Sequence, residues 1–515
     1  MSQMRSNIDN AEDWFEIRTQ LIVDPYFERE FFTNLIYIMD RKKTIRELFE
    51  CSLKLLDRAG QYNDQVDRSL LHLMHCFQAT NSLREGYQWL PMAQGLYSLA
   101  LSRGEARAFI DCGPELRSSS KACSVQDFEV LIRREAREIN SFEEAWSSLL
   151  FLLENRSVRA QAIQVLVTQS SQESDDLTFQ LLMKALDLAF SFAWKKNDLI
   201  LRRAFTRFWT RPQTASLPVS VARAASVLSS GGLEAPQSSR TEWRLEWAEE
   251  LWHRISKESL ESAWEMMRDL SRESCGLDQL VLAIELFRGR LLFGMRQEQW
   301  PLVTRSLLRA DAWGSAARWI PEKREFYLAA CLSDLVSIAQ RVNYQALTRP
   351  TGDSIYGSFS ENMTKNQLVL RLDDSVEQGD REQALELMAL LTRDRGMSQS
   401  LSDRLLLLAS KQDAWTYDQA SIPTAKLITQ TYRAAVQAGL PQATYSDAAF
   451  GLLRFLCDQR ELALLEAKTR GQYQDGGLTR SVFDVSGGAR IVDRFVFNQL
   501  RNAQRIFVWP TEGKG

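Results

Sequence analysis

The stretch 64-DQVDRSLLHLMHCFQATNSLR-84 decides the fold class. Its apolar side chains recur at steps of three or four residues, at Val66, Leu70, Leu73 and Phe77. Because an α-helix turns once every 3.6 residues, these steps place the apolar side chains on one face of a helix. A half-buried strand would alternate every second residue instead. The stretch is therefore predicted to be an amphipathic α-helix.

The same spacing recurs along the chain. It covers 92–101, 146–153, 175–194, 241–255, 277–294, 323–342, 383–391 and 491–508. The best strand candidate, 367–372, fits a turn of helix equally well. The chain has only 24 Gly and 12 Pro among 515 residues, and helices exclude both residue types from their interiors. The sequence therefore predicts an all-α protein with little or no sheet.

A chain of 515 residues is too long for one ordinary hydrophobic core. The stretch 211–240 contains Pro212, Pro218, Pro236 and the pair Gly231-Gly232, which favour a break in regular structure. We therefore expect an N-terminal helical domain at 1–210, a linker or long loop at 211–240 and a C-terminal helical domain at 241–515.

Three segments, 72–102, 283–313 and 425–456, resemble one another loosely. In each, a long helical pattern is followed by a short polar turn and a second helical pattern. Hairpins of this kind bury their apolar faces against neighbouring hairpins. The sequence therefore predicts stacked α-hairpins, arranged as an α-solenoid or an α/α-toroid-like array.

Charge and cysteine content limit the partners and the compartment. Lys and Arg number 63 against 66 Asp and Glu, a net charge of −3. A dedicated nucleic-acid binder normally carries a basic excess, so that role is disfavoured. No secretion signal or transmembrane stretch is recognisable, and the seven cysteines are scattered and odd in number. We therefore expect a cytoplasmic protein with reduced thiols.

The three histidines are the candidate catalytic or metal-binding residues. His72 could share a metal with His75 or Cys76, since residues three or four apart lie on one helix face. Glu250 and His253 have the Glu-x-x-His spacing of di-iron bundles, which need two such motifs where this chain has one. We therefore predict no metal site, and these residues stay as candidates. The sequence indicates no particular cofactor.

Two groups of residues are candidates for binding a partner. Arg203, Arg207 and Arg211 recur every four residues and so share a helix face that suits an acidic partner. A solvated helix face is the alternative. Trp243, Trp247 and Trp252 are residues of the kind that dominate protein interfaces, although tryptophans on a helical stripe are more often part of the core.

Two short segments resemble a known family. The segment 75-HCFQATNSL-83 resembles the His-x-x-x-x-Thr-x-x-Leu helix of questin oxidase-like helical proteins, and 426-KLITQTYR-433 is similar to another of their helices, with Lys426 where a histidine is expected. The resemblance implies an all-helical oxidoreductase that uses oxygen on an aromatic substrate, with His75 lining the site.

The sequence contains no phosphate-binding loop, dinucleotide fingerprint, serine-hydrolase elbow or metalloprotease motif. The leading hypothesis is therefore a helical-repeat binding protein, a scaffold, adaptor or subunit of an assembly with a protein partner. The alternatives are a cofactor-light or metal-dependent oxidoreductase with a histidine-containing pocket between helices, and a carbohydrate-active α/α-toroid.

Overall fold

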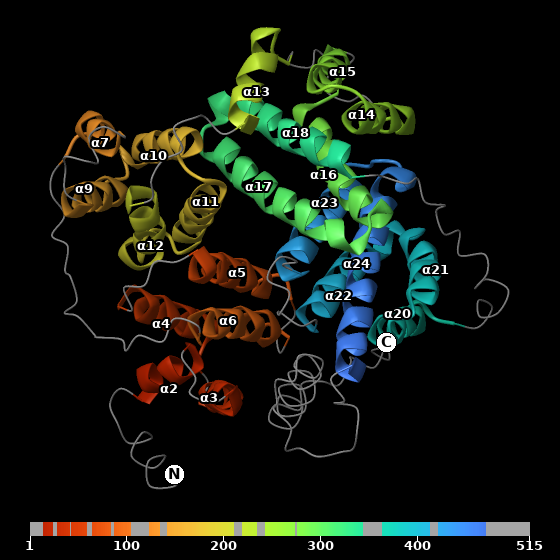
Figure 1. Ribbon diagram of the computed structural model, residues 1–515, viewed down its shortest axis with the longest axis horizontal. Coiled ribbons are helices and arrows are strands. Elements are labelled where there is room, and N and C mark those ends of the chain that lie inside the picture. Colours follow the sequence, from red (N-terminus) through yellow and green to blue (C-terminus); the bar gives the residue numbers. More distant parts are fainter. Residues whose placement is uncertain are drawn as a thin grey trace, which may run out of the picture. The chain divides into compact units, whose positions relative to one another are not determined.

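The computed structural model describes residues 14–23, 28–41, 43–58, 64–83, 87–104, 123–133, 142–210, 219–233, 243–272, 275–342, 363–411 and 421–469. In these ranges the regular structure is helical throughout and no strand occurs (Figure 1). The predicted all-α class is therefore confirmed. The strand candidate 367–372 lies inside helix α20 (Lys365–Gln378).

The chain forms two compact units. The first comprises Met1–Glu115, Leu406–Pro423 and Gln459–Gly515, and the second comprises Leu116–Leu405 and Thr424–Asp458. This division differs from the one expected from the sequence. The expected linker 211–240 lies inside the second unit and contains helix α13 (Val219–Ser229), whose Val221, Ala224 and Val227 are buried. In the sequence, the Pro and Gly residues on either side of α13 hide the fact that these apolar side chains recur every three residues.

The described residues in the N-terminal part of the first unit form five helices, which are α2 (Trp14–Val23), α3 (Glu28–Asp40), α4 (Ile45–Arg58), α5 (Asp64–Thr80) and α6 (Trp89–Gly104). The apolar side chains that predict α5 are all buried. Helix α6 packs closely on α5 because Gly95 has no side chain: a Cβ there would lie 2.9 Å from Cδ1 of Leu73. Later chain segments complete the unit, since Gln94 Nε2 donates to the carbonyl oxygen of Ser410 at 2.7 Å.

The second unit contains most of the helices. They are α7 (Val125–Ile132), α9 (Phe142–Glu154), α10 (Arg159–Glu173), α11 (Asp176–Ser191), α12 (Asn197–Thr210), α13, α14 (Leu245–Lys257), α15 (Leu260–Arg272), α16 (Leu277–Gly294), α17 (Trp300–Trp319), α18 (Arg324–Arg341), α20 and α21 (Arg381–Thr392). Three more helices are divided between the units, namely α22 (Ser398–Lys411), α23 (Ser421–Gln437) and α24 (Gln442–Thr469).

Helices α16, α17 and α18 pack against one another in the second unit, and α11 packs against α17. Short 3₁₀ turns, Gln297–Gln299 and Pro321–Lys323, lead into α17 and α18. Helix α24 approaches α16 at a pair of glycines. A Cβ on Gly289 would lie 2.6 Å from Cβ of Ala448, and one on Gly451 would overlap the Gly289 carbonyl oxygen. Only glycine fits at this crossing.

Most helices expected from the sequence are present in the structure. The stretch 277–294 coincides with α16, and 323–342 exceeds α18 by one residue at each end. The hairpin segments 72–102, 283–313 and 425–456 contain parts of α5 and α6, of α16 and α17, and of α23 and α24. A regular repeat along the chain stays a prediction. The expected helix 491–508 lies outside the described residues.

Within the described ranges, no helix has both the length and the apolar composition needed to cross a membrane.

Candidate functional site

The two neighbouring histidines lie on α5 in the first unit. His75 is buried and His72 is half-buried. The Nε2 atom of His72 lies 3.4 Å from Sγ of Cys76. Burial lowers the pKa of His72 to about 4, so its imidazole is neutral at pH 7. The sequence therefore correctly placed His72 and Cys76 side by side.

His253 lies in the second unit, on α14, where its side chain is exposed and its Nε2 lies 3.9 Å from Oε1 of Glu258. Glu250 accepts a hydrogen bond from Nε of Arg254 at 2.9 Å. Among the residues that the structure describes, no group of three or more His, Cys, Asp or Glu side chains is placed to hold a metal ion. The candidates His72, His75, Glu250 and His253 therefore form no ligand set there.

The prediction that Arg203 and Arg207 lie on an outward basic face of α12 is wrong, because both side chains are buried. Nε of Arg207 donates to Oγ1 of Thr178 at 2.8 Å, and its Nη2 lies 3.2 Å from Oδ2 of Asp175, the N-cap residue of α11. This arginine joins α12 to α11. The four-residue spacing identified residues on a common face, but it cannot tell an outer face from an inner one. Arg211 lies outside the described residues.

The tryptophans in α14 and just before it lie mainly in the core. Trp243 and Trp252 are buried, and Trp247 is half-buried. Nε1 of Trp252 donates to the carbonyl oxygen of Ala283 at 2.9 Å, and its ring stacks on Phe287. The core interpretation is therefore confirmed for Trp252, which fixes α14 to α16.

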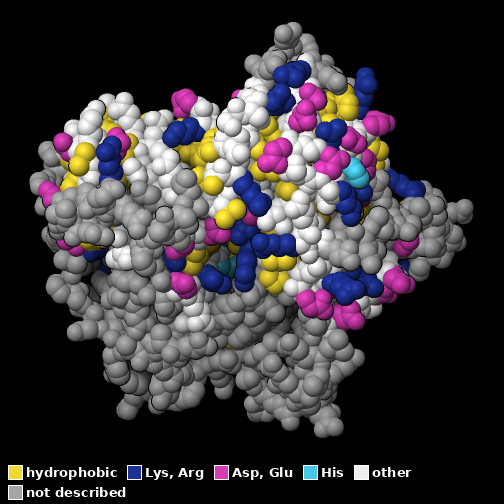
Figure 2. All heavy atoms as spheres, turned by 45° about the horizontal axis from the view of Figure 1, so that its top comes forward, with side chains coloured by type: hydrophobic (Ala, Val, Ile, Leu, Met, Phe, Trp, Pro, Cys, Tyr) yellow, Lys and Arg dark blue, Asp and Glu magenta, His cyan; other side chains and the backbone are white. Residues whose placement is uncertain are grey.

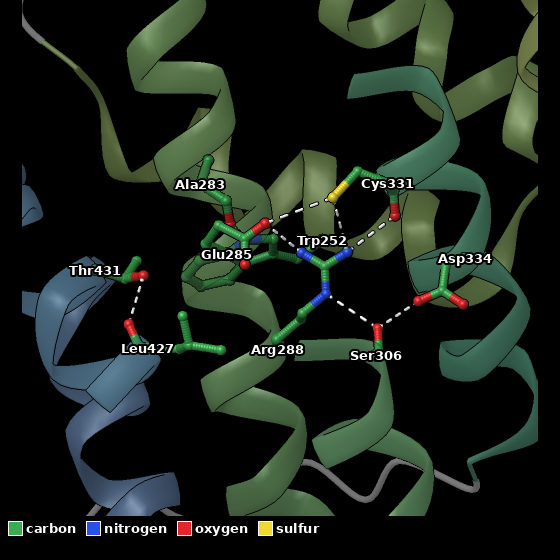
Figure 3. A network of polar contacts seen from close by, with 9 residues as sticks. All are labelled: Trp252, Ala283, Glu285, Arg288, Ser306, Cys331, Asp334, Leu427 and Thr431. Atoms are coloured by element: carbon green, nitrogen blue, oxygen red, sulfur yellow. Dashed lines mark hydrogen bonds and ion pairs between the residues drawn. The ribbon is translucent and has the colours of Figure 1, made fainter. Parts of the chain in front are cut away.

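Arg288 is the centre of a buried polar network that joins α16, α17 and α18 (Figure 3). Its guanidinium donates to Oε1 of Glu285 at 2.5 Å, to Oγ of Ser306 at 3.1 Å and to the carbonyl oxygen of Cys331 at 2.9 Å. Ser306 in turn donates to Oδ2 of Asp334 at 2.6 Å. Each of the three helices contributes at least one of these groups, so the network fixes how they pack.

The electrostatics of this network favour a permanent ion pair over a reactive group. Burial disfavours the charged form of Arg288, but Cys331, Glu285 and Asp334 outweigh it and raise the pKa of this arginine. Burial also raises the pKa of the Cys331 thiol to about 12. A thiol with that pKa is protonated at pH 7 and is a poor nucleophile. We therefore assign the network a structural role.

A cluster of three aromatic rings lies at the surface of the second unit, where α11 and α17 end. We call Phe190, Trp194 and Trp319 the aromatic triad. Both Trp194 and Phe190 lie 5.8 Å from Trp319 between ring centroids, and Phe190 lies 6.4 Å from Trp194. The side chain of Phe190 is 63% exposed, which is unusual for a residue of this size.

The backbone beneath the triad adopts a rare conformation. Ala193 and Trp194 have φ values of 51° and 63°, the only positive φ values among the described residues other than glycine. The left-handed region is disfavoured for side chains with a Cβ and costs of order 1–3 kcal/mol per residue. The conformation folds Trp194 back onto the end of α11, where the backbone N–H of Trp194 donates to the Ala189 carbonyl oxygen at 2.9 Å. Such strain often accompanies a functional surface.

A cationic side chain lies over one ring of the triad. The guanidinium carbon of Arg159 lies 5.0 Å from the ring centroid of Trp194, and the exposed Arg156 is three residues earlier in the chain. Lys195 and Lys196 follow Trp194 directly, and both are exposed. The sequence analysis did not single out these lysines and so missed this site. The one signal for this site in the sequence is the aromatic-rich segment 190–194, which is followed directly by two lysines.

The comparisons with known proteins give no independent indication of function, because no family model, curated protein or solved structure matches this chain.

Proposed function

We propose that this chain is a helical binding protein, an adaptor or a subunit of a larger assembly, and that the aromatic triad contacts its protein partner. The observation that carries the proposal is the exposed Phe190 ring beside Trp194 and Trp319. Aromatic side chains dominate the binding energy of protein interfaces, and cations around them select the partner's charge.

The partner segment that best fits this surface is acidic and carries an apolar side chain. Arg159 lies over the Trp194 ring, and the exposed Lys195 and Lys196 directly follow Trp194 in the chain. An apolar side chain of the partner covers Phe190, and Asp or Glu residues next to it meet the cations. Figure 2 shows one face of the molecule, on whose upper part acidic and basic side chains lie interspersed.

A library of random peptides displayed on phage tests the proposal with the full chain as bait. We expect the retained peptides to be enriched in Asp and Glu next to an aromatic or aliphatic residue. The affinity of a synthetic peptide of this kind should fall about tenfold or more in Phe190→Ala, because truncating a hot-spot residue at the centre of an interface costs about 2 kcal/mol or more. Binding should also weaken with added salt, since the cations contribute.

The matched control is Val219→Ala, which truncates another exposed apolar side chain in the same unit, 67% exposed on α13. It should leave the affinity unchanged. A charge reversal, Lys195→Glu with Lys196→Glu, should weaken binding as well. Peptides without acidic enrichment, or equal affinity for Phe190→Ala and Val219→Ala, would refute the assignment of this surface.

The histidine-based oxidoreductase and the carbohydrate-active toroid stay as alternative predictions. Metal analysis of the purified protein tests the first alternative: stoichiometric iron or zinc that is lost in His75→Ala would favour it over the binding role. For the second alternative, the test is hydrolysis of a panel of oligosaccharides by the purified chain.

A further inference from the structure

Arg159 is fixed at the point where the chain turns from α9 into α10. It is the first residue of α10, and both helices belong to the second unit. In the turn, Oδ1 of Asn155 accepts hydrogen bonds from the backbone N–H and the hydroxyl of Ser157, at 3.1 Å and 2.8 Å. A turn closed by such side-chain hydrogen bonds has a defined backbone conformation. The Arg159 side chain therefore begins at a fixed position.

The guanidinium of Arg159 binds the last two carbonyl groups of α9. Its Nε donates to the carbonyl oxygen of Leu153 at 2.5 Å, and its Nη2 donates to that of Glu154 at 3.3 Å. The last four carbonyl groups of an α-helix have no partner within the helix and carry partial negative charge, so a cation is favourable there. Two bonds to adjacent carbonyl groups also hold the planar guanidinium in one orientation.

The same guanidinium lies against the Trp194 ring of the aromatic triad. The distance of 5.0 Å between the guanidinium carbon and the ring centroid is within the range of a cation–π contact. A planar guanidinium can stack on an aromatic ring while its N–H groups donate elsewhere. Arg159 therefore connects the end of α9 to the triad.

Trp194 is the member of the triad that most needs support from its surroundings. Its φ of 63° follows the φ of 51° at Ala193, and such conformations persist only where neighbouring groups fix them. The hydrogen bond to the Ala189 carbonyl oxygen fixes the backbone of Trp194. It does not fix the side-chain rotamer of this half-buried residue. The Arg159 guanidinium restrains the ring itself.

We propose that Arg159 is the positioning residue of the aromatic triad, because it holds the Trp194 ring in the orientation that binds the partner. This inference rests on the proposed function and specifies how its site is kept ready. A ring that is ordered before the partner arrives does not have to be ordered on binding, so the affinity is higher. The carbonyl groups of α9 offset part of the Arg159 charge. Selection of an acidic partner then falls mainly to the exposed Lys195.

Fluorine NMR of the full chain labelled with 5-fluorotryptophan tests the position of the ring without any partner. The signal of Trp194 is the one that is missing in Trp194→Phe. In Arg159→Met this signal should move, and its shift between H2O and D2O should grow, because the ring face becomes exposed to solvent. The matched control is Arg156→Met, which removes the same charge from an exposed arginine of the same turn. The control should leave the Trp194 signal in place.

The affinity of the acidic peptide selected by phage display gives the second readout, which separates positioning from charge attraction. In Arg159→Met it should fall about fivefold, as expected if only about one ring in five keeps the binding orientation. This loss should persist in about 0.5 M sodium chloride, whereas any loss in Arg156→Met should disappear there, because salt screens exposed charges.

The two readouts distinguish failure of this inference from failure of the proposed function. A Trp194 signal that stays in place in Arg159→Met would overturn the inference, whether or not a peptide binds. So would an affinity that falls in Phe190→Ala but not in Arg159→Met, or a loss in Arg159→Met that added salt abolishes. Equal affinity for Phe190→Ala and Val219→Ala would instead refute the proposed function, and the inference with it.

Discussion

Replacing Lys426 by methionine should stabilise the protein at neutral pH and change how its stability depends on pH. The pKa of Lys426 is lowered from 10.5 to about 7 in the folded protein. The unfolded chain therefore binds more protons than the folded one between these values, so stability rises with pH across this window. Below about pH 7 the full penalty is present, and above about pH 10.5 it is gone.

The size of the effect follows from the shift. One pKa unit corresponds to about 1.4 kcal/mol, so the penalty at pH 7 is on the order of 4 kcal/mol, and most of it should vanish by pH 10. Methionine removes the charge while keeping an apolar chain of similar length. The ion pairs of Lys184 with Asp311 and of Arg318 with Asp187 stay intact in this variant.

Urea unfolding at several pH values from 7 to 10, followed by tryptophan fluorescence, measures the difference between wild type and Lys426→Met. We expect the variant to be more stable at pH 7 and the difference to shrink by roughly 1 kcal/mol per pH unit. Taking the difference cancels the contribution of titrating groups that do not interact with Lys426. Lys323→Met, at an exposed position, should show a small and constant difference. A Lys426→Met protein less stable than wild type at pH 7, or a difference independent of pH, would refute the reasoning.

Three further predictions concern the packing and the buried network. Gly451→Ala should lower the unfolding free energy by about 1–3 kcal/mol or more in urea titrations, since the added Cβ would overlap α16. Gly314→Ala should raise the unfolding free energy slightly, because a Cβ there would meet nothing within 4 Å. Arg288→Met should cost about 3–5 kcal/mol, because its carboxylate partners lose their cation; an unchanged midpoint would contradict this. With a thiol reagent at pH 8, Cys331 should react far more slowly than the half-buried Cys123, since burial raises the Cys331 pKa to about 12.

The helical class could be predicted because it depends on local spacing. The helix α5 and both ends of α16 could be predicted from the spacing of their apolar side chains. This spacing can be read from a short window of sequence, because it depends only on which side chains share a helix face. The division into units could not be predicted in the same way. Residues 406–423 complete the first unit through contacts such as Gln94 to Ser410, and no local pattern reveals contacts between segments so distant.

The candidate sites show the same contrast. The spacing of Arg203 and Arg207 correctly put them on one face, but whether that face points outward depends on α11, whose Asp175 and Thr178 bind Arg207. Lys426 stood out in the sequence only as a departure from a family pattern. Its neighbours Lys184 and Asp311 are more than 100 residues away in the chain, so their convergence required the fold.

The way the first unit is assembled has a consequence for synthesis on the ribosome. Residues 116–405 must be made after the N-terminal segment and before the segment that begins at Leu406. At about 5–20 residues per second, translation of residues 116–405 takes roughly 15–60 seconds after α5 and α6 have been made. During that interval Ser410, whose carbonyl oxygen accepts the hydrogen bond from the Gln94 side chain, has not yet been synthesised. We therefore expect the nascent N-terminal helices to benefit from a chaperone until the later segment has been made.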